Sequence, residues 1–505
     1  MPDLFESTYK PLQNGSDVRG IAITAGSEQK NLTPEIAAHI AGAFVTYLAR
    51  KTAKSPEALR IGVGHDSRLT AGELKSSILR GLAPASVFDC GLVSTPAVFL
   101  STVLPQSHFD GALMITASHL PFNRNGIKFF TRDGGLEASE VKALLQEAAV
   151  LAAKVPERTA AKAAPAVPFD LVGLYSEHMK QLIRTATGAA PEDLPLSGLH
   201  IAADAGNGAA GFFASRILEP LGADISGSVF LEPDGHFPNH IPNPENAGAM
   251  KAISSAVTAA KADLGVIFDC DGDRAAVVFS DGSPVNRNAL IALLSAILAE
   301  EHPGCTVVTD SVTSDELAVF LTEQLQLKHL RFKRGYKNVI DKGQELNREG
   351  IDCELAIETS GHGALKENYF SDDGAYLCVK IIAQMANMKK QGRRIEELIE
   401  TLGAPAEAEE IRFHITGSDF AAYGASVLED FRAFAAAHQY TIVEPNYEGI
   451  RLSFRDPEVR GWVLLRMSLH DPVMPMNLEA SSAGGTAVIL RRLQPFFAAH
   501  SRLER

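Results

Sequence analysis

Residues 262–274 read ADLGVIFDCDGDR, a short apolar run that ends in three alternating aspartates. An apolar run of this length, bounded by polar residues, predicts a buried β-strand rather than a helix. The same design recurs in FDGALMITASH at residues 109–119 and in IDCELAIETSGH at residues 351–362. The three segments therefore predict three strands, each of which ends in a loop that carries chemically active side chains.

A second apolar segment precedes each of these strands and also ends in an acidic loop of small residues. The three segments are LRIGVGHDSR at 59–68, LHIAADAGNGAAG at 199–211 and CTVVTDSVTSDEL at 305–317. A helix-like stretch follows each one, and strands that alternate with helices favour βαβ units. We therefore expect an α/β fold with three similar α/β domains, each built on a mixed, largely parallel sheet. Because such sheets bind ligands beyond the carboxyl ends of their strands, the polar loops are the candidate sites.

The chain after residue 410 has a different pattern. The strand-like segments IRFHITG, TIVEPNYEGIRLSF and GWVLLRMSLHD are combined with helix-like stretches near 418–437 and 483–500. This order predicts a smaller C-terminal α+β domain. An Ala/Pro-rich segment at 151–170 predicts a linker, and further seams are expected near 280–290 and 401–410. The predicted domains are 1–165, 166–284, 285–405 and 406–505. Each contains one of the four polar loops described below.

Size and composition exclude several classes of protein. A chain of 505 residues is too long for one core, and 46% hydrophobic with 21% charged residues is typical of soluble globular proteins. A formal charge of −14 argues against a nucleic-acid partner. The absence of a long apolar run and the polar start MPDLFESTYK argue against a membrane partner or a signal peptide. Five scattered cysteines without a CxxC pattern predict buried thiols and a cytoplasmic location.

The DCDGDR loop predicts a metal site. Asp269, Asp271 and Asp273 follow a buried strand directly, and three carboxylates so close repel one another unless a cation neutralises them. Oxygen ligands alone suit a hard ion such as Mg²⁺. A calcium loop of the D-x-D-x-D-G type would need a glycine and a closing glutamate where Arg274 and Ser280 stand. We therefore interpret the loop as a magnesium site.

The TASH loop presents Ser118 directly after a predicted strand. A serine in this position is more often a cap or a turn residue, and the G-x-S-x-G pattern of α/β-hydrolases is absent. A serine hydroxyl can instead carry a phosphoryl group. A phosphoserine close to three aspartates would need a divalent ion and basic side chains to balance the charge. The basic candidates are Arg19 in NGSDVRG, Lys128 and Arg274.

The ETSGH loop offers groups that can bind a sugar. Glu358 and Ser360 are two residues apart in a predicted extended loop, so both can hydrogen-bond neighbouring sugar hydroxyls. His362 is a candidate for proton transfer near neutral pH. The segment RGYKNVID adds Gly335, Tyr336 and Lys337 as a further possible phosphosugar contact.

The RMSLHDP loop offers donors to a phosphate group. Arg466, Ser468 and His470 alternate after the predicted strand GWVLL, and charge-assisted donors of this kind bind phosphate. The competing interpretation is a polar turn before Pro472.

Taken in order, NGSDVRG, TASH, DGDR, SGH and RMSLHDP resemble the α-D-phosphohexomutase superfamily, the phosphoglucomutase/phosphomannomutase enzymes, along essentially the whole chain. The resemblance implies four domains around a central cleft, of which the first three share one α/β topology. It implies an intramolecular phosphotransferase that interconverts the 1-phosphates and 6-phosphates of glucose, mannose or both. A sugar 1,6-bisphosphate would be the intermediate and the priming phosphoryl donor. Hexose phosphates would be the partners of a monomer or homodimer.

The resemblance also implies roles for single residues. Ser118 would be the phosphorylated serine, and its phosphate would complete a Mg²⁺ shell formed by Asp269, Asp271 and Asp273. Arg19, Lys128 and His362 would support phosphoryl and proton transfer. Glu358 and Ser360 would form the sugar-selecting loop, and Arg466 and Ser468 the phosphate loop. Apart from the resemblance, the candidate substrate contacts are Arg274, Gly335, Tyr336 and Lys337, and His470 is a candidate phosphate contact.

Two departures from the family pattern leave alternatives open. Leu120 stands where the serine loop of the family commonly has asparagine, and His470 stands where its phosphate loop usually has a small hydroxyl residue. One alternative is a hexose-1,6-bisphosphate synthase that takes its phosphoryl group from a donor such as fructose-1,6-bisphosphate. A second is a catalytically silent protein that binds sugar phosphates.

Overall fold

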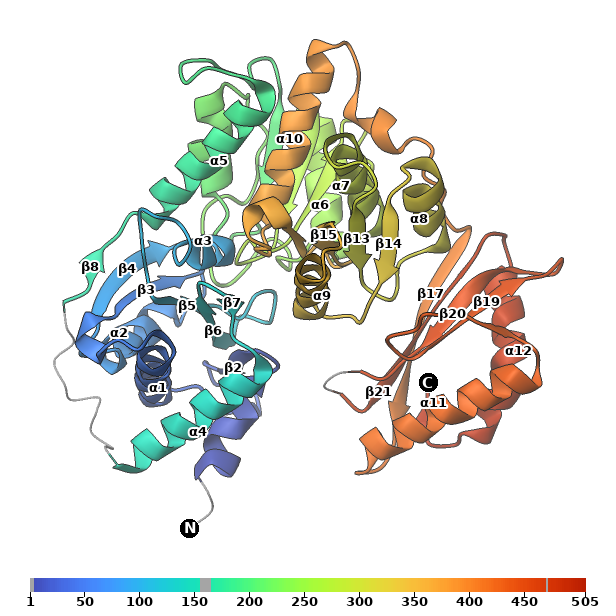
Figure 1. Cartoon of the computed structure of the whole chain (residues 1–505), viewed down its shortest axis with the longest axis horizontal. Coiled ribbons are helices and arrows are strands. Elements are labelled where there is room, and N and C mark those ends of the chain that lie inside the picture. Colours follow the sequence, from blue (N-terminus) through green and yellow to red (C-terminus); the bar gives the residue numbers. More distant parts are fainter. Residues whose placement is uncertain (1–3, 155–164, 469–470) are drawn as a thin grey trace. The chain divides into compact units, whose positions relative to one another are not determined.

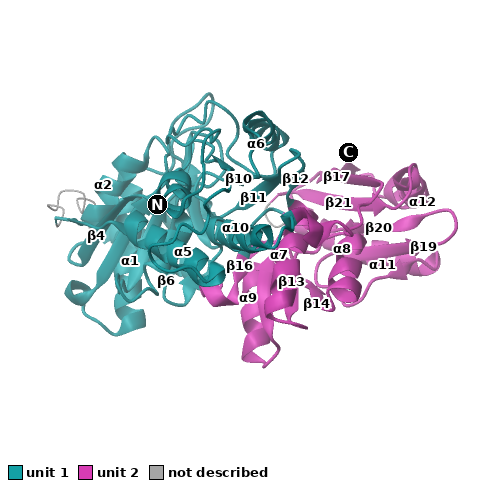
Figure 2. Cartoon of the chain, turned by 90° about the horizontal axis from the view of Figure 1, so that it is seen from above, with its two compact units in different colours: residues 1–286, 360–363, 371–395 teal, residues 287–359, 364–370, 396–505 magenta. Residues whose placement is uncertain are grey.

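A computed structural model describes residues 4–154, 165–468 and 471–505 (Figure 1). The chain folds into two compact units (Figure 2). Unit 1 contains residues 1–286, 360–363 and 371–395, and unit 2 contains residues 287–359, 364–370 and 396–505. Two short segments from the later half of the chain are thus built into the unit formed by its first half.

The first sheet lies in unit 1 and has the strand order β1-β2-β6-β5-β3-β4-β8, with β7 paired to β6. β3 is parallel to both β4 and β5, whereas β6 is antiparallel to β5. The bounds are β1 Gln13–Asn14, β2 Asp17–Ile21, β3 Arg60–His65, β4 Ser86–Leu92, β5 Gly111–Ile115, β6 Arg124–Thr131, β7 Gly134–Gly135 and β8 Val167–Pro168.

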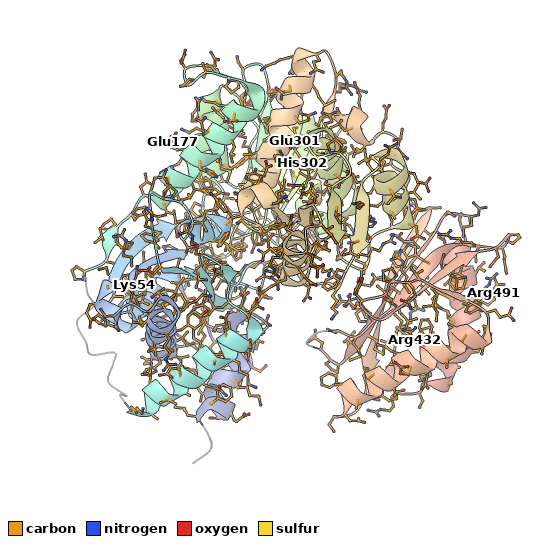
Figure 3. The ribbon with its side chains drawn as sticks, viewed as in Figure 1. Lys54, Glu177, Glu301, His302, Arg432 and Arg491 are labelled. Carbon is orange, nitrogen blue, oxygen red and sulfur yellow. The ribbon has the colours of Figure 1, made fainter. Side chains whose placement is uncertain are left out.

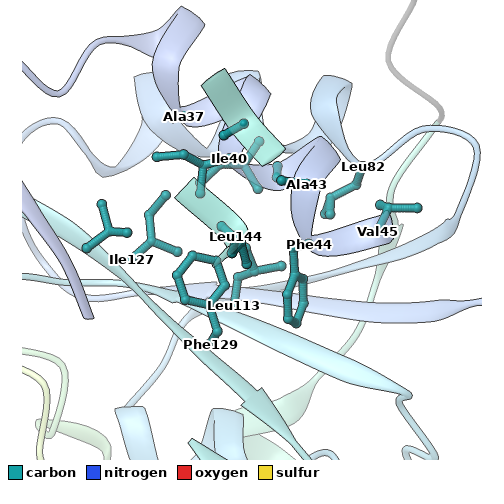
Figure 4. Close-up of a cluster of buried hydrophobic side chains, with 14 of the residues drawn as sticks. Ala37, Ile40, Ala43, Phe44, Val45, Leu82, Leu113, Ile127, Phe129 and Leu144 are labelled. Atoms are coloured by element: carbon teal, nitrogen blue, oxygen red, sulfur yellow. The ribbon is translucent and has the colours of Figure 1, made fainter. Parts of the chain in front are cut away.

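Helices α1 Pro34–Thr52, α2 Ala71–Gly81, α3 Thr95–Leu100 and α4 Ala138–Lys154 accompany this sheet. The Thr33 side chain caps α1 by accepting from the amide of Ile36, and Pro34 stands at its first position, where no amide hydrogen is needed. Phe44 of α1 and Leu144 of α4 pack with Phe129 of β6 in one buried apolar cluster (Figure 4). This core holds the strands whose ends carry the first polar loop.

The second sheet, also in unit 1, has the order β12-β11-β10-β9. β9 and β10 are parallel, and β11 returns antiparallel to β10. Helices α5 and α10 pack side by side (Figure 1). The bounds are β9 Ile201–Asp204, β10 Leu264–Phe268, β11 Ala275–Phe279, β12 Pro284–Val285, α5 Leu171–Thr187, α6 Ala247–Ala260 and α10 Gly374–Lys390.

The third sheet has the order β14-β13-β15-β16, and β13 is parallel to both β14 and β15. Its bounds are β13 Thr306–Thr309, β14 Lys328–Arg331, β15 Cys353–Ile357 and β16 Gly363–Leu365, with helices α7 Arg287–Glu301, α8 Asp315–Val319 and α9 Tyr336–Arg348. Shorter helical turns elsewhere span Phe5–Tyr9, Lys10–Leu12, Pro56–Ala58, Phe213–Leu218, Glu219–Leu221, Phe320–Gln324, Lys366–Asn368 and Ile395–Ile399.

The fourth sheet lies in unit 2 and has the order β18-β19-β20-β21-β17-β22. It is antiparallel and packs with the two helices as an α+β domain. The bounds are β17 Glu407–Ile415, β18 Thr441–Ile442, β19 Ile450–Arg455, β20 Arg460–Leu465, β21 Val473–Ala480, β22 Leu503–Glu504, α11 Phe420–Ala437 and α12 Gly485–Ala499.

The predicted fold class is confirmed. In each of the first three sheets the two strands expected from the sequence repeat are parallel neighbours, namely β3 with β5, β9 with β10, and β13 with β15. Strands β11 and β12 form a hairpin directly before α7. The five cysteines are buried and free, as predicted. Among the described residues, no helix is both long enough and apolar enough to span a membrane.

Two predictions about single elements need correction. The ends of the predicted linker 151–170 are structured, since α4 continues to Lys154 and β8 pairs with β4, while residues 155–164 lie outside the described part of the chain. The alanines that suggested a linker also favour a helix. The second correction is strand β21, which no sequence pattern predicted. Pro475 lies within it, and proline argues against a central strand because it lacks an amide hydrogen.

Candidate active site

Ser118 lies just beyond β5 in the first sheet. Its backbone has a φ of +50°, in the left-handed region that a residue with a Cβ rarely adopts. The Ser118 amide donates to Thr116 Oγ1 at 2.8 Å, which helps to hold this conformation. The side chain is buried, and its Oγ lies 2.9 Å from Asp269 Oδ2. The structure therefore turns the hydroxyl towards the aspartate loop of the second sheet.

The three aspartates lie between the ends of β10 and β11, two strands of one hairpin. Asp269, Asp271 and Asp273 are each at most 1% exposed, and they offer carboxylate oxygens that lie within 4.8 Å of one another. Gly272 turns the loop between them with a φ of +73°, a conformation that favours glycine. The predicted metal-ligand set is thus assembled by a turn within one hairpin.

Two buried cations face these carboxylates. Lys128 Nζ on β6 lies 2.5 Å from Asp273 Oδ2 and 3.5 Å from Asp271 Oδ2. Arg274, which follows the aspartates, lies with Nε 3.3 Å from Asp269 Oδ2. Two cations against three carboxylates leave one negative charge uncompensated. The pKa values reflect this imbalance.

Burial, together with the nearby charges of Asp273 and Asp271, raises the pKa of Asp269 well above its ordinary value. Burial alone would also raise the pKa values of the other two aspartates. At Asp271 the charges of Lys128 and Arg19 and the hydrogen bond from Thr95 oppose burial, and at Asp273 the charges of Lys128 and Arg274 do so. Together these groups bring both pKa values below the ordinary value. The surroundings therefore disfavour the charged form of Asp269, and a further cation would stabilise that form.

The donor set fits Mg²⁺. Among the described residues, Asp271 Oδ1 and Asp273 Oδ1 are buried oxygens without a hydrogen-bond partner. A buried carboxylate oxygen without a partner costs folding free energy, and a divalent ion would satisfy both oxygens. A hard cation prefers these oxygen ligands.

Arg274 also contacts Ser118. Its Nη2 lies 3.3 Å from Ser118 Oγ, and its Nη1 lies 3.2 Å from Asn243 Oδ1. The same Nη2 contacts Nδ1 of His119. Because a guanidinium only donates, Nδ1 must accept and the His119 ring is neutral. Arg274 is therefore placed to stabilise negative charge on the serine oxygen.

Arg19 on β2 contacts the same loop. Its Nη1 donates to the carbonyl of Thr116 at 2.9 Å, and its Nη2 pairs with Asp17 at 2.8 Å. Its positive charge contributes to the low pKa of Asp271. Arg19 is thus a neighbour of the serine loop, as the sequence predicts.

His362 completes the group of predicted residues in unit 1. Its Nε2 lies 3.6 Å from Asp273 Oδ1 and 3.7 Å from Asp372 Oδ2, and its Nδ1 lies 3.0 Å from Ser360 Oγ. Burial, with the charges of Arg274 and Lys128, lowers the pKa of His362 well below its ordinary value. This modifies the expectation of titration near neutral pH, because these surroundings disfavour the charged form of the ring.

The other predicted residues lie in unit 2. Glu358 accepts a hydrogen bond from the amide of Gly335 at 2.6 Å, at the position before α9. Arg466 is 6% exposed, and its Nη1 lies 3.8 Å from Glu448 Oε1. Glu448 Oε2 accepts from the amide of Arg334 at 3.1 Å, so one carboxylate connects Arg466 with the residue before Gly335. Unit 2 thereby brings the predicted sugar and phosphate loops together.

Four predicted contact residues remain, of which three have local partners. Tyr336 packs against the apolar cluster of the third sheet, and Lys337 pairs with Asp341 at 3.0 Å along α9. Ser468 Oγ accepts from the amide of Asp471 at 3.3 Å, which is typical of a turn residue. His470 lies outside the described residues.

Charged groups elsewhere pair locally and are weaker candidates. Lys54 Nζ lies 2.6 Å from Asp110 Oδ1, and Arg432 Nη1 lies 3.5 Å from Glu444 Oε1. Figure 3 labels Lys54 and Arg432 among the side chains. Exposed pairs of this kind contribute little free energy. A further group that could hold a metal consists of His302, Asp352 and Glu354, but the ammonium of Lys366 lies 2.7 Å from both carboxylates.

Sequence reasoning missed three groups in these sites. Thr95, at the start of α3, donates from Oγ1 to Asp271 Oδ2 at 2.6 Å, and no sequence pattern marks it. Glu448 is likewise unmarked. Arg68 follows β3 in the predicted loop GHDSR, where the strand-end rule could have drawn attention to it.

Comparison with protein families matches three consecutive parts of the chain. The domain I model of phosphoglucomutase/phosphomannomutase, described as alpha/beta/alpha, matches residues 10–150. The corresponding models of domains II and III match residues 174–282 and 286–404.

Individual relatives cover almost the whole chain. A phosphoglucomutase/phosphomannomutase of Thermococcus kodakarensis is 30% identical over 92% of this chain and 93% of the relative. A phosphoglucomutase of Neisseria gonorrhoeae is 28% identical over 96% of this chain and 95% of its own. A crystal structure of a phosphoglucomutase/phosphomannomutase family protein from Burkholderia thailandensis has a TM-score of 0.76 at 24% identity, covering 98% and 99% of the two chains, and it supports the fold.

Proposed function

Because this chain belongs to the phosphoglucomutase/phosphomannomutase family of phosphotransferase mutases, we propose that it interconverts hexose 1-phosphates and hexose 6-phosphates through phosphorylated Ser118. The observation that carries the proposal is the 2.9 Å contact between Ser118 Oγ and Asp269 Oδ2, inside a cluster of three buried carboxylates and two buried cations. A turn or cap serine needs no such surroundings.

The charges of the site match the requirements of phosphoryl transfer, which depends mainly on alignment and charge stabilisation. The phosphorus–oxygen bond to Ser118 breaks as a sugar hydroxyl oxygen forms a new bond to phosphorus. Arg274 donates to the serine oxygen and stabilises its developing charge. His362 accepts the proton that the sugar hydroxyl loses. Lys128 and Arg19 balance the charge of the phosphoryl group.

Asp269, Asp271 and Asp273 would hold Mg²⁺, which supplies positive charge next to the transferred phosphoryl group when bound. The two buried oxygens without partners are the structural support for this assignment.

The residues of the other predicted loops recognise the substrate in this proposal. Glu358 and Ser360 bind sugar hydroxyls, and Arg466 with Ser468 holds the phosphate that is not reacting. The bisphosphosugar formed by the first transfer then turns end for end and returns its other phosphate to Ser118. A sugar 1,6-bisphosphate therefore serves as the priming donor.

The first test combines kinetics with intact mass. Purified protein is incubated with glucose 1,6-bisphosphate and Mg²⁺, and its mass is compared with that of Ser118→Ala. We expect a single added phosphoryl group in the original chain and none in the variant. We also expect Ser118→Ala to lower the rate of glucose 6-phosphate formation by more than about 10³-fold, in line with loss of a covalent nucleophile. An active variant, or an original chain that never gains the phosphoryl group, would refute the proposal.

The product distribution distinguishes the mutase from the bisphosphate synthase. Glucose 1-phosphate and mannose 1-phosphate are supplied with and without fructose-1,6-bisphosphate, and the products are followed by ³¹P NMR. We expect the hexose 6-phosphate as end product with only catalytic bisphosphate. Accumulation of the bisphosphosugar at the expense of fructose-1,6-bisphosphate would favour the synthase. None of the described residues favours the bisphosphate synthase over the mutase. The proximity of Ser118, the aspartates, Lys128 and His362 argues against a catalytically silent binding protein.

A further inference from the structure

Arg68 is a buried arginine behind the serine loop that plays no part in the scheme above. It follows β3, and its side chain has no exposed surface. Its Nη1 donates to the carbonyls of Pro121 and Arg124, both at 2.9 Å, and its Nη2 donates to the carbonyls of Ser118 and Leu120, both at 2.5 Å. One guanidinium therefore binds four carbonyl oxygens in the segment 118–124.

Asp66, two residues before Arg68, lies next to this guanidinium. Its Oδ1 accepts from the amide of Arg68 at 3.0 Å, and its Oδ2 lies 3.4 Å from Arg68 Nε. The same Oδ2 accepts from Cys270 Sγ at 3.3 Å. Cys270 stands between Asp269 and Asp271 in the chain. The loop after β3 therefore contacts both the serine loop and the aspartate loop.

The serine loop needs such support for two physical reasons. Ser118 adopts a left-handed backbone conformation, which persists only where the surroundings hold it. The loop also turns several carbonyls inward, and a buried carbonyl without a donor costs about 1–3 kcal/mol. A guanidinium offers five N–H groups in a planar fork, so it can satisfy four carbonyls at once. A lysine ammonium carries its three donors on a single nitrogen and cannot span the same positions.

We propose that Arg68 is a positioning residue for phosphoryl transfer, which sets the distance between Ser118 Oγ and the aspartate loop without touching the substrate. This inference rests on the proposed function and deepens it. A misplacement of about 1 Å at a reacting group can lower a rate by about 10²-fold. The role of Arg68 should therefore appear in the rate of transfer rather than in substrate affinity.

The test uses Arg68→Lys in the full chain, with Arg60→Lys as the matched control. Arg60 begins the same strand β3 at its opposite end, and its Nη2 donates to the carbonyl of Ser107 at 3.1 Å. We expect Arg68→Lys to lower kcat for a hexose 1-phosphate by about 10²-fold with KM changed by less than about threefold. Arg60→Lys should change either parameter by less than about twofold.

Two further measurements separate positioning from loss of structure. Direct titration with Mg²⁺ should give the same affinity for Arg68→Lys as for the original chain, because the three aspartates are unaltered. In Arg68→Lys, the single-turnover rate of phosphoryl transfer from phosphorylated Ser118 should fall by the same factor as kcat. Asp66→Asn, which keeps the side-chain shape but weakens the hold on Arg68, should lower kcat in the same direction by about tenfold.

Each outcome is decisive. A folded Arg68→Lys with kcat equal to that of Arg60→Lys, or with a raised KM and unchanged kcat, would overturn the positioning role. If neither Arg68→Lys nor Asp66→Asn folds, the role of Arg68 is to stabilise the fold, and the positioning role is also overturned. If the original chain has no mutase activity, it is the proposed function that fails, and this is seen before any variant is made.

Discussion

At the scale of single residues, burial decides the charge state of the groups in the site. The sequence identifies Asp269 and His362 as ionisable groups at strand ends, but it does not show how far they are removed from water. Burial raises the pKa of Asp269 and lowers that of His362, because in both cases it disfavours the charged form. The surroundings therefore favour a cation beside the aspartate loop and the uncharged form of the histidine ring.

Burial of Glu479 predicts that the free energy of unfolding depends on pH. Burial raises the pKa of this β21 carboxyl from 4.5 to about 7, against the opposing effect of a hydrogen bond from Trp462 Nε1 at 2.8 Å. Between these pKa values the folded state holds a proton that the unfolded state has lost, so stability falls as pH rises through this range. Glu479→Gln removes the penalty and keeps an acceptor for Trp462. We expect the variant to be more stable than the original chain by about 1–3 kcal/mol at pH 8 and about equal at pH 5.

Urea unfolding of unit 2 at the two pH values measures this difference. Glu429→Gln on the exposed side of α11 is the control for loss of one negative charge. A Glu479→Gln variant with the same gain at both pH values would contradict the assignment of the effect to a raised pKa.

At the scale of elements, the sequence pattern predicts the strands of the threefold repeat but not strand β21 of the fourth sheet. Apolar runs between acidic loops identify β5, β10 and β15, because a fully buried strand is apolar on both faces. β21 escapes the pattern because Pro475 suits an edge strand better than the interior of a sheet. Close packing between elements is another property that residue patterns do not show.

The contact between α1 and α2 supplies a test at this scale. A Cβ at Gly81 of α2 would lie 2.1 Å from the carbonyl oxygen of Ala38, whereas one at Gly72 of the same helix would meet no atom within 4 Å. We expect Gly81→Ala to destabilise the protein by about 1–3 kcal/mol or more, since backbone cannot move aside easily. Gly72→Ala should stabilise it by about 0.5–1 kcal/mol, because alanine favours a helix. Thermal unfolding of both variants measures the difference, and equal effects would show that α2 is not packed so closely against α1.

At the scale of the whole molecule, the chain is divided into two units that do not follow the order of the sequence. The predicted metal ligands and Ser118 belong to unit 1, whereas Arg466 and Glu358 belong to unit 2. The short segments 360–363 and 371–395 join unit 1 from the later part of the chain, and they supply His362 to its site. The domain limits 165, 284 and 405 remain a prediction.

This division predicts a local effect of Mg²⁺. A ligand that binds only the folded state stabilises it by about 2.7 kcal/mol at one hundred times its dissociation constant. Because the three aspartates all lie in unit 1, Mg²⁺ should slow hydrogen exchange in β10 and β11 and leave β19 and β20 unchanged. Chelation should reverse the effect, and Asp271→Asn should weaken it. Equal protection of both units, or none, would contradict a magnesium site at the aspartates.

The amino-acid order by itself determined the α/β architecture, the threefold repeat and the polar groups at the strand ends. It could do so because these features depend on local periodicity and on the rule that parallel strands end at a common edge. Only the tertiary structure decided which of these groups meet. The contacts of Ser118 with Asp269 and of Arg68 with four carbonyls join residues from separate parts of the chain. Burial and charge state follow from such long-range packing, and a local pattern carries no information about it.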